Sequence, residues 1–109
     1  MKILLAVRES EKKEIVSVLQ SQELQFYVVD QLPSLTEIAG DFQFALIDED
    51  FDGLQTGWTL ARIIRQTGRS IKIVMIVRKN PERDLISLYD MTLGFPISEE
   101  ELIGEIHRK

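Results

Sequence analysis

Short apolar runs alternate with amphipathic stretches along the whole chain. Several of these runs are apolar at nearly every position and rich in Val, Ile, Leu and Phe, which is typical of parallel strands covered on both faces. The pattern predicts five strands, at Lys2–Val7, Phe26–Val29, Phe42–Ile47, Ile71–Val77 and Met91–Gly94.

The stretches between and after these strands predict about five helices. Ser10 is expected to cap the first helix, in which Ile15, Val18 and Leu19 share one face. The other helices are expected at Ser34–Gly40, Gly57–Gln66, Pro81–Tyr89 and from Ser98 onward.

Strands and helices that alternate in this way predict an α/β fold, because right-handed crossovers place helices on both faces of a parallel sheet. We expect a flavodoxin-like three-layer sandwich with five parallel strands in the order 2-1-3-4-5. No linker or repeat interrupts the 109 residues, so residues 1–109 are expected to form a single domain.

In such a sheet, ligands bind outside the carboxyl ends of the strands, near the switch between the first and third strands. Asp48 directly follows the third predicted strand and opens an acidic loop that also contains Glu49, Asp50 and Asp52. The loop has two possible interpretations, a solvated acidic turn or a weak site for a divalent cation.

The composition excludes several classes of function. The chain has no cysteine and one histidine, which excludes disulfides and thiolate metal sites. The formal net charge of −5 argues against a general nucleic-acid partner, and no apolar run reaches the ~20 residues that a membrane span needs. We therefore expect a cytoplasmic protein that binds no membrane, no metal and no cofactor.

An enzyme or nucleotide-binding domain on the same fold is one alternative. It would need a phosphate cradle after the first strand, but Arg8-Glu9-Ser10 at that place contains no glycine. The sequence also lacks a serine elbow and a cysteine nucleophile, so this alternative has little support.

The segment Phe42–Asp48 resembles the third strand of bacterial response-regulator receiver domains, in which an aspartate accepts a phosphoryl group. Three further segments resemble the same family: Lys2–Leu5 its opening strand, Thr56-Gly57 the start of its third helix, and Pro96–Leu102 the start of its last helix. The resemblance covers essentially the whole chain, and it implies that Asp48 stands at the phosphoacceptor position.

The same resemblance implies a degenerate phosphorylation pocket. The family's magnesium-binding acids after the first strand would fall at Val7 and Arg8, with Glu9 as the next carboxylate, its hydroxyl at Val77 and its lysine at Phe95. Phosphoryl transfer requires the negative charge on the phosphoryl oxygens to be neutralised, so a pocket without these groups is expected to be silent.

Arg8 places a permanent cation where the family's metal would lie. One hypothesis is that Arg8 forms a bidentate ion pair with Asp48 and holds it in a non-nucleophilic state. The other is that Arg8 is an ordinary solvated loop residue.

The preferred function is that of an atypical receiver-like signalling domain, not an enzyme, which acts by phosphorylation-independent protein–protein interaction and possibly forms a homodimer. The alternative is a functional phosphoryl-accepting receiver that uses Asp48 with a non-standard magnesium site. The family's usual docking face would here include Arg83, Ile86, Tyr89, Met91, Glu101 and Glu105.

Overall fold

The computed structural model describes residues 2–33, 38, 42–68 and 70–108, and it contains one parallel sheet. The strands are β1 (Lys2–Ala6), β2 (Gln25–Val28), β3 (Phe44–Asp48), β4 (Lys72–Val77) and β5 (Met91–Gly94). They are arranged in the order β2-β1-β3-β4-β5, and every neighbouring pair is parallel. The predicted flavodoxin-like topology is confirmed.

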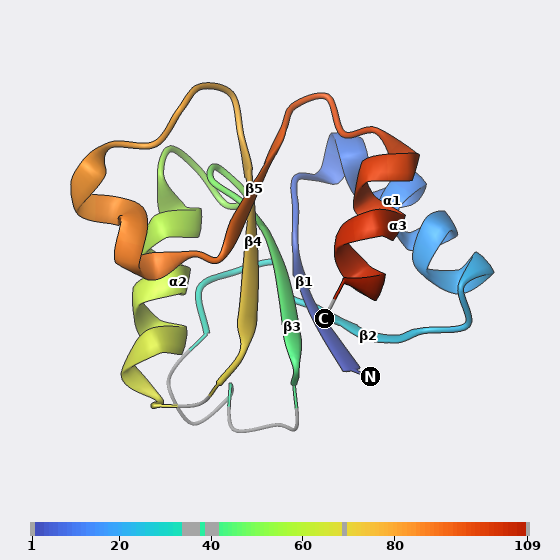
Figure 1. Cartoon of the computed structure of the whole chain (residues 1–109), viewed down its shortest axis with the longest axis horizontal. Coiled ribbons are helices and arrows are strands. Elements are labelled where there is room, and N and C mark those ends of the chain that lie inside the picture. The colour runs from blue at the N-terminus through green and yellow to red at the C-terminus, as the bar shows by residue number, and fades with distance from the viewer. Residues whose placement is uncertain (1, 34–37, 39–41, 69, 109) are drawn as a thin grey trace.

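Helices cover both faces of this sheet (Figure 1). On one face lie α1 (Glu9–Ser21) and α3 (Glu99–His107), and on the other lie α2 (Thr56–Gln66) and a short 3-10 helix, η1 (Arg83–Leu88). In the described part of the chain, none of the helices is long and apolar enough to cross a membrane.

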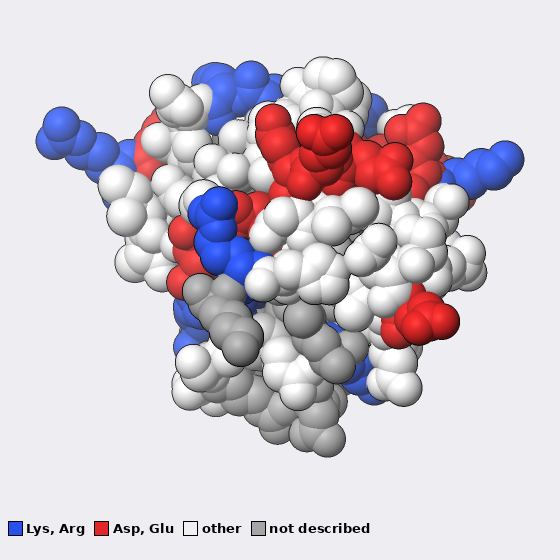
Figure 2. Space-filling view, turned by 45° about the vertical axis from the view of Figure 1, so that its right-hand side comes forward, with Lys and Arg blue, Asp and Glu red and all other residues white. Residues whose placement is uncertain are grey.

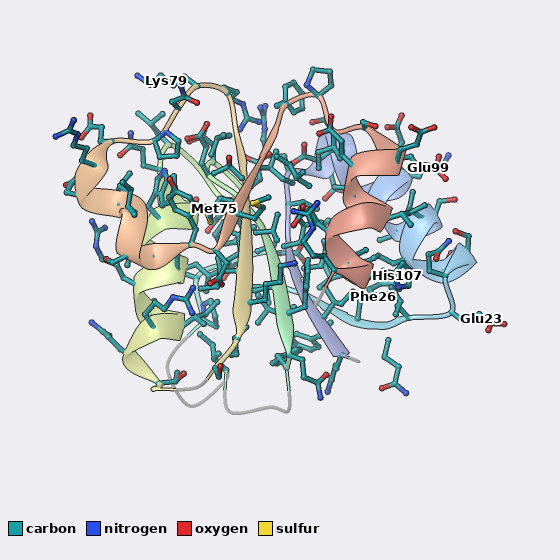
Figure 3. The ribbon with its side chains drawn as sticks, in the orientation of Figure 1. Glu23, Phe26, Met75, Lys79, Glu99 and His107 are labelled. Atoms are coloured by element: carbon teal, nitrogen blue, oxygen red, sulfur yellow. The ribbon has the colours of Figure 1, made fainter. Side chains whose placement is uncertain are left out.

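The alternation of side chains along the strands produces two separate cores. On β3, Phe44 and Leu46 pack with α1 and α3, whereas Ala45 and Ile47 pack with α2. Met75 of β4, labelled in Figure 3, belongs to the α2 side. Because successive strand residues point to opposite faces, strands buried on both sides must be apolar throughout, as the sequence pattern required.

The predicted helices differ from the observed ones in three places. The helix expected at Ser34–Gly40 lies almost wholly outside the described residues. The one expected at Pro81–Tyr89 is the shorter 3-10 helix η1. Ser10 is not the cap of α1, because the helix begins earlier and the Glu11 Oε1 accepts a hydrogen bond from the Arg8 N–H at 3.1 Å.

The start of α2 approaches the end of β3 so closely that residue 57 must be glycine. A Cβ atom at Gly57 would lie 2.2 Å from the carbonyl oxygen of Asp48. The backbone N–H of Gly57 also donates to the carbonyl of Glu49 at 2.8 Å, which holds the helix against the strand end. This contact sets the path of the acidic loop between β3 and α2.

The close approach predicts that Gly57→Ala destabilises the fold by about 3 kcal/mol, because backbone atoms cannot move aside as a flexible side chain would. The matched control is Gly104→Ala in α3, where an added Cβ meets nothing within 4 Å. That substitution should stabilise by about 0.5–1 kcal/mol, since alanine favours a helix interior. Urea denaturation of both variants measures the difference, and equal effects would contradict this account of Gly57.

Candidate functional site

Asp48 is the last residue of β3 and is completely buried. It lies at the carboxyl edge of the sheet, flanked on one side by β1 and on the other by β4. Its Oδ1 accepts a hydrogen bond from the backbone N–H of Asp50 at 2.8 Å, which fixes the carboxylate at the start of the acidic loop. A buried carboxylate of this kind requires a cation or further donors nearby.

Arg78, the residue that follows β4, supplies that cation. Its Nη1 and Nη2 donate to Asp48 Oδ1 and Oδ2 at 2.7 and 3.0 Å, so both carboxylate oxygens are bonded to one guanidinium. Nη1 also lies 3.7 Å from carboxylate oxygens of Glu49 and of Asp50. The ring of Phe95 lies 4.7 Å from the guanidinium carbon and covers it.

The predicted ion pair between Arg8 and Asp48 is therefore wrong. Arg8 is exposed and forms the N-cap of α1, where its carbonyl accepts from the backbone N–H groups of Glu11 and Lys12. Since β1 and β4 both flank β3, the sequence offered a cation on each side of the aspartate. The sequence did contain the signal for Arg78, which directly follows the strand next to β3, but it did not decide between the two.

Glu11 is a second buried acid of the site, and the sequence analysis missed it. It is 8% exposed, and one of its oxygens, Oε2, is buried without a donor. Burial, together with a hydrogen bond shared with the Asp48 carboxylate, raises the pKa of Glu11 to about 8. A proton on Glu11 therefore joins the two carboxyl groups near neutral pH. The available signal was helical spacing, because Glu11 shares a face of α1 with Ile15 and Leu19.

The two acids respond to burial in opposite ways. Burial by itself would raise the pKa of Asp48, but the hydrogen bonds from Arg78, from Glu11 and from the Asp50 N–H outweigh it and lower this pKa below its ordinary value. The ion pair with Asp48 also raises the pKa of Arg78. The cluster therefore holds an ionised Asp48, a protonated Glu11 and a permanent cation.

The other residues expected in the pocket are distributed as follows. Val7 and Val77 are buried apolar side chains at the ends of their strand regions, where they provide no ligand or donor. Glu9 is exposed and pairs with Lys12 at 2.8 Å, away from Asp48. Phe95, at the position of the family's lysine, contacts the cluster through Arg78.

The residues present do not fit a magnesium ion. Magnesium requires several oxygen ligands in near-octahedral geometry, whereas both oxygens of Asp48 are already bonded to Arg78. Across the described ranges, no group of three or more acidic or histidine side chains is placed to hold a metal ion. The guanidinium of Arg78 takes the charge-neutralising role that a metal would have beside Asp48.

Comparison with solved structures agrees with this fold. No family model matches the sequence, and no curated protein matches it. A response regulator receiver protein from Pseudoalteromonas atlantica superimposes with a TM-score of 0.78 at 12% identity, over 96% of this chain and 92% of that one. The receiver domain of the sensor histidine kinase PA1611 from Pseudomonas aeruginosa gives 0.77 at 19% identity, over 98% and 94%.

The response regulator TrrA from Thermotoga maritima, solved with Mg²⁺ and BeF, likewise gives a TM-score of 0.77 at 17% identity, over 96% of this chain and 95% of that one. Together with the strand order, these matches show that the chain has the flavodoxin-like fold of response-regulator receiver domains.

The ion pair leads to a stability prediction. Arg78→Gln leaves Asp48 buried without its cation and should lower the free energy of unfolding by about 3 kcal/mol. Adding Asp48→Asn should recover at least half of this loss, since the uncompensated charge is then gone. Arg8→Gln is the matched control and should change stability by less than about 0.5 kcal/mol. Urea denaturation of the four proteins gives the double-mutant cycle, and purely additive losses would contradict the pairing.

The raised pKa of Glu11 predicts a pH dependence of stability. Between about pH 5 and 8 the folded chain holds a proton on Glu11 that the unfolded chain releases, so the free energy of unfolding should fall as pH rises through this window. The slope contributed by one such proton is at most about 1.4 kcal/mol per pH unit. Glu11→Gln, which keeps a neutral donor, should remove this contribution. The measurement is urea unfolding at several pH values, and identical profiles for the two proteins would refute it.

Proposed function

We propose that this chain is a receiver-like signalling domain that acts by binding protein partners in the cytoplasm, without phosphorylation and without enzymatic activity. The observation that carries the proposal is the buried bidentate pair between Asp48 and Arg78. A phosphoacceptor must present a free carboxylate oxygen to the phosphorus, and both oxygens of Asp48 face the guanidinium instead.

The surroundings of Asp48 support the same conclusion. In its solved structure, the PA1611 receiver domain coordinates a magnesium ion in the active-site cleft. In the present chain, Val7 and Arg8 stand at the positions of the family's metal-binding acids, and the apolar Val77 and Phe95 stand at those of its phosphoryl contacts. Without these groups, the charge that develops on a transferred phosphoryl group is not neutralised.

One observation favours the alternative of a phosphoryl-accepting receiver. Arg78 is a fixed cation beside Asp48, and arginine is well suited to bind phosphoryl oxygens. In that case Arg78 would release the carboxylate and neutralise the incoming group. The cost of breaking a buried bidentate pair makes this the second candidate.

The partner-binding face expected from the family is only partly available. The expected residues were Arg83, Ile86, Tyr89, Met91, Glu101 and Glu105. The structure withdraws Glu105, which is buried and paired with Lys72 at 3.4 Å. Tyr89 packs edge-on against Trp58 with ring centroids 5.8 Å apart, so it contributes to the core. Ile86, at 57% exposure, remains as the apolar centre of this candidate face, through which a homodimer or another protein could bind.

Incubation with acetyl phosphate and Mg²⁺, followed by intact-mass measurement, tests the proposed function. We expect no phosphoryl adduct on the wild-type chain, because neither the metal ligands nor the phosphoryl contacts are in place. A receiver that carries the complete residue set serves as the positive control under the same conditions. An adduct that disappears in Asp48→Asn would overturn the proposal, and its additional loss in Arg78→Gln would establish the alternative.

A further inference from the structure

A long open groove runs between α1 and the segment that joins β5 to α3. Its volume is about 770 Å³. Its apolar lining consists of Ile15, Val18, Phe95, Pro96, Ile97 and Leu102. Phe95 is 43% exposed, so part of this apolar surface is in contact with solvent. The described residues therefore leave an apolar strip uncovered beside the buried charge cluster.

Acidic side chains surround this strip. Glu14 of α1 and Glu99 of α3 line the groove, with Lys13 as the lining cation. Glu99 lies at the first turn of α3, labelled in Figure 3, and is followed by the exposed Glu100 and Glu101. Figure 2 turns the α1 and α3 side forward and shows acidic side chains gathered across the upper part of this face. The surface therefore favours a cationic ligand over an anionic one.

The length of the groove favours a helical occupant. It follows α1 from Ser10 to Ser21, a distance of ~16 Å at a helical rise of 1.5 Å per residue. This corresponds to about three turns of a partner helix. An apolar strip with charged edges is the usual complement of an amphipathic helix whose apolar residues repeat every three to four positions.

Two residues connect the groove to the Asp48 cluster. Glu11 lines the groove and shares a hydrogen bond with Asp48. Phe95 lines it from the opposite side and covers the guanidinium of Arg78. The ion pair therefore holds both walls of the groove in place, which reduces the ordering that a partner must impose when it binds.

We propose that this groove binds an amphipathic helix of a protein partner, with apolar residues on one face and Lys or Arg along both edges of that face. The inference rests on the proposed function, for which it supplies the chemistry of the partner. The acidic edges select the basic helix, and the apolar strip between α1 and the β5–α3 segment provides the contact area.

The test uses a fluorescent synthetic peptide of about 16 residues, with leucine at helical spacing and lysine on both flanks. A second peptide carries glutamate in place of lysine. Fluorescence anisotropy should show that the lysine peptide binds the full chain at least about tenfold more tightly, and that added salt weakens this binding. Glu14→Lys should reduce the affinity about fivefold or more, because it reverses a charge on the edge of the groove.

Glu82→Lys is the control, since Glu82 is exposed next to η1 on the other face of the sheet and should leave the affinity unchanged. Amide chemical shift changes in residues 10–21 and 95–102 would place the peptide in the groove. Equal binding of both peptides, no effect of Glu14→Lys, shifts centred on Ile86, or self-association that depends on Glu14 would each overturn the inference. A phosphoryl adduct on Asp48 would overturn the proposed function and leave the peptide result unaffected.

Discussion

The geometry at the carboxyl edge of the sheet depends on one ion pair, between the buried carboxylate of Asp48 and the guanidinium of Arg78. A carboxylate removed from water is stable only if a cation and hydrogen-bond donors replace the lost hydration. Arg78 provides the cation, and the Asp50 N–H and the protonated Glu11 provide further donors. The ends of β3 and β4, the first turn of α1 and the ring of Phe95 are all positioned around this pair.

The fold was largely predictable because both cores follow from simple alternation. Each central strand is apolar on both faces, which allows no register in which one face meets water. The start of α1 was predicted less well, since Ser10 and Arg8 lie two residues apart and the choice depends on where the Glu11 side chain finds a donor. The short η1 was expected as an α-helix, and Pro81 with its neighbours gave no way to separate the two kinds of helix.

The site was only half predictable, for a different reason. The position of Asp48 follows from strand topology alone, whereas the choice between Arg8 and Arg78 depends on the direction of the chain after each strand. After β1 the backbone turns at once into α1 with Arg8 as its cap, but after β4 Arg78 is anchored by its own backbone N–H to Glu49 at 2.8 Å. Glu11 was missed because an acidic residue in a first helical turn is usually a solvated partner of the helix dipole.

The close packing of three ionisable groups also limits the mutational paths open to this domain. Replacing one member leaves a buried charge or an unpartnered oxygen, so each single step passes through a destabilised protein. Exchange of the Asp48–Arg78 pair for apolar residues, by contrast, can be nearly neutral once both changes are made. A designer who wished to rebuild a metal-dependent phosphorylation site here would have to alter several positions at once, and could not proceed residue by residue.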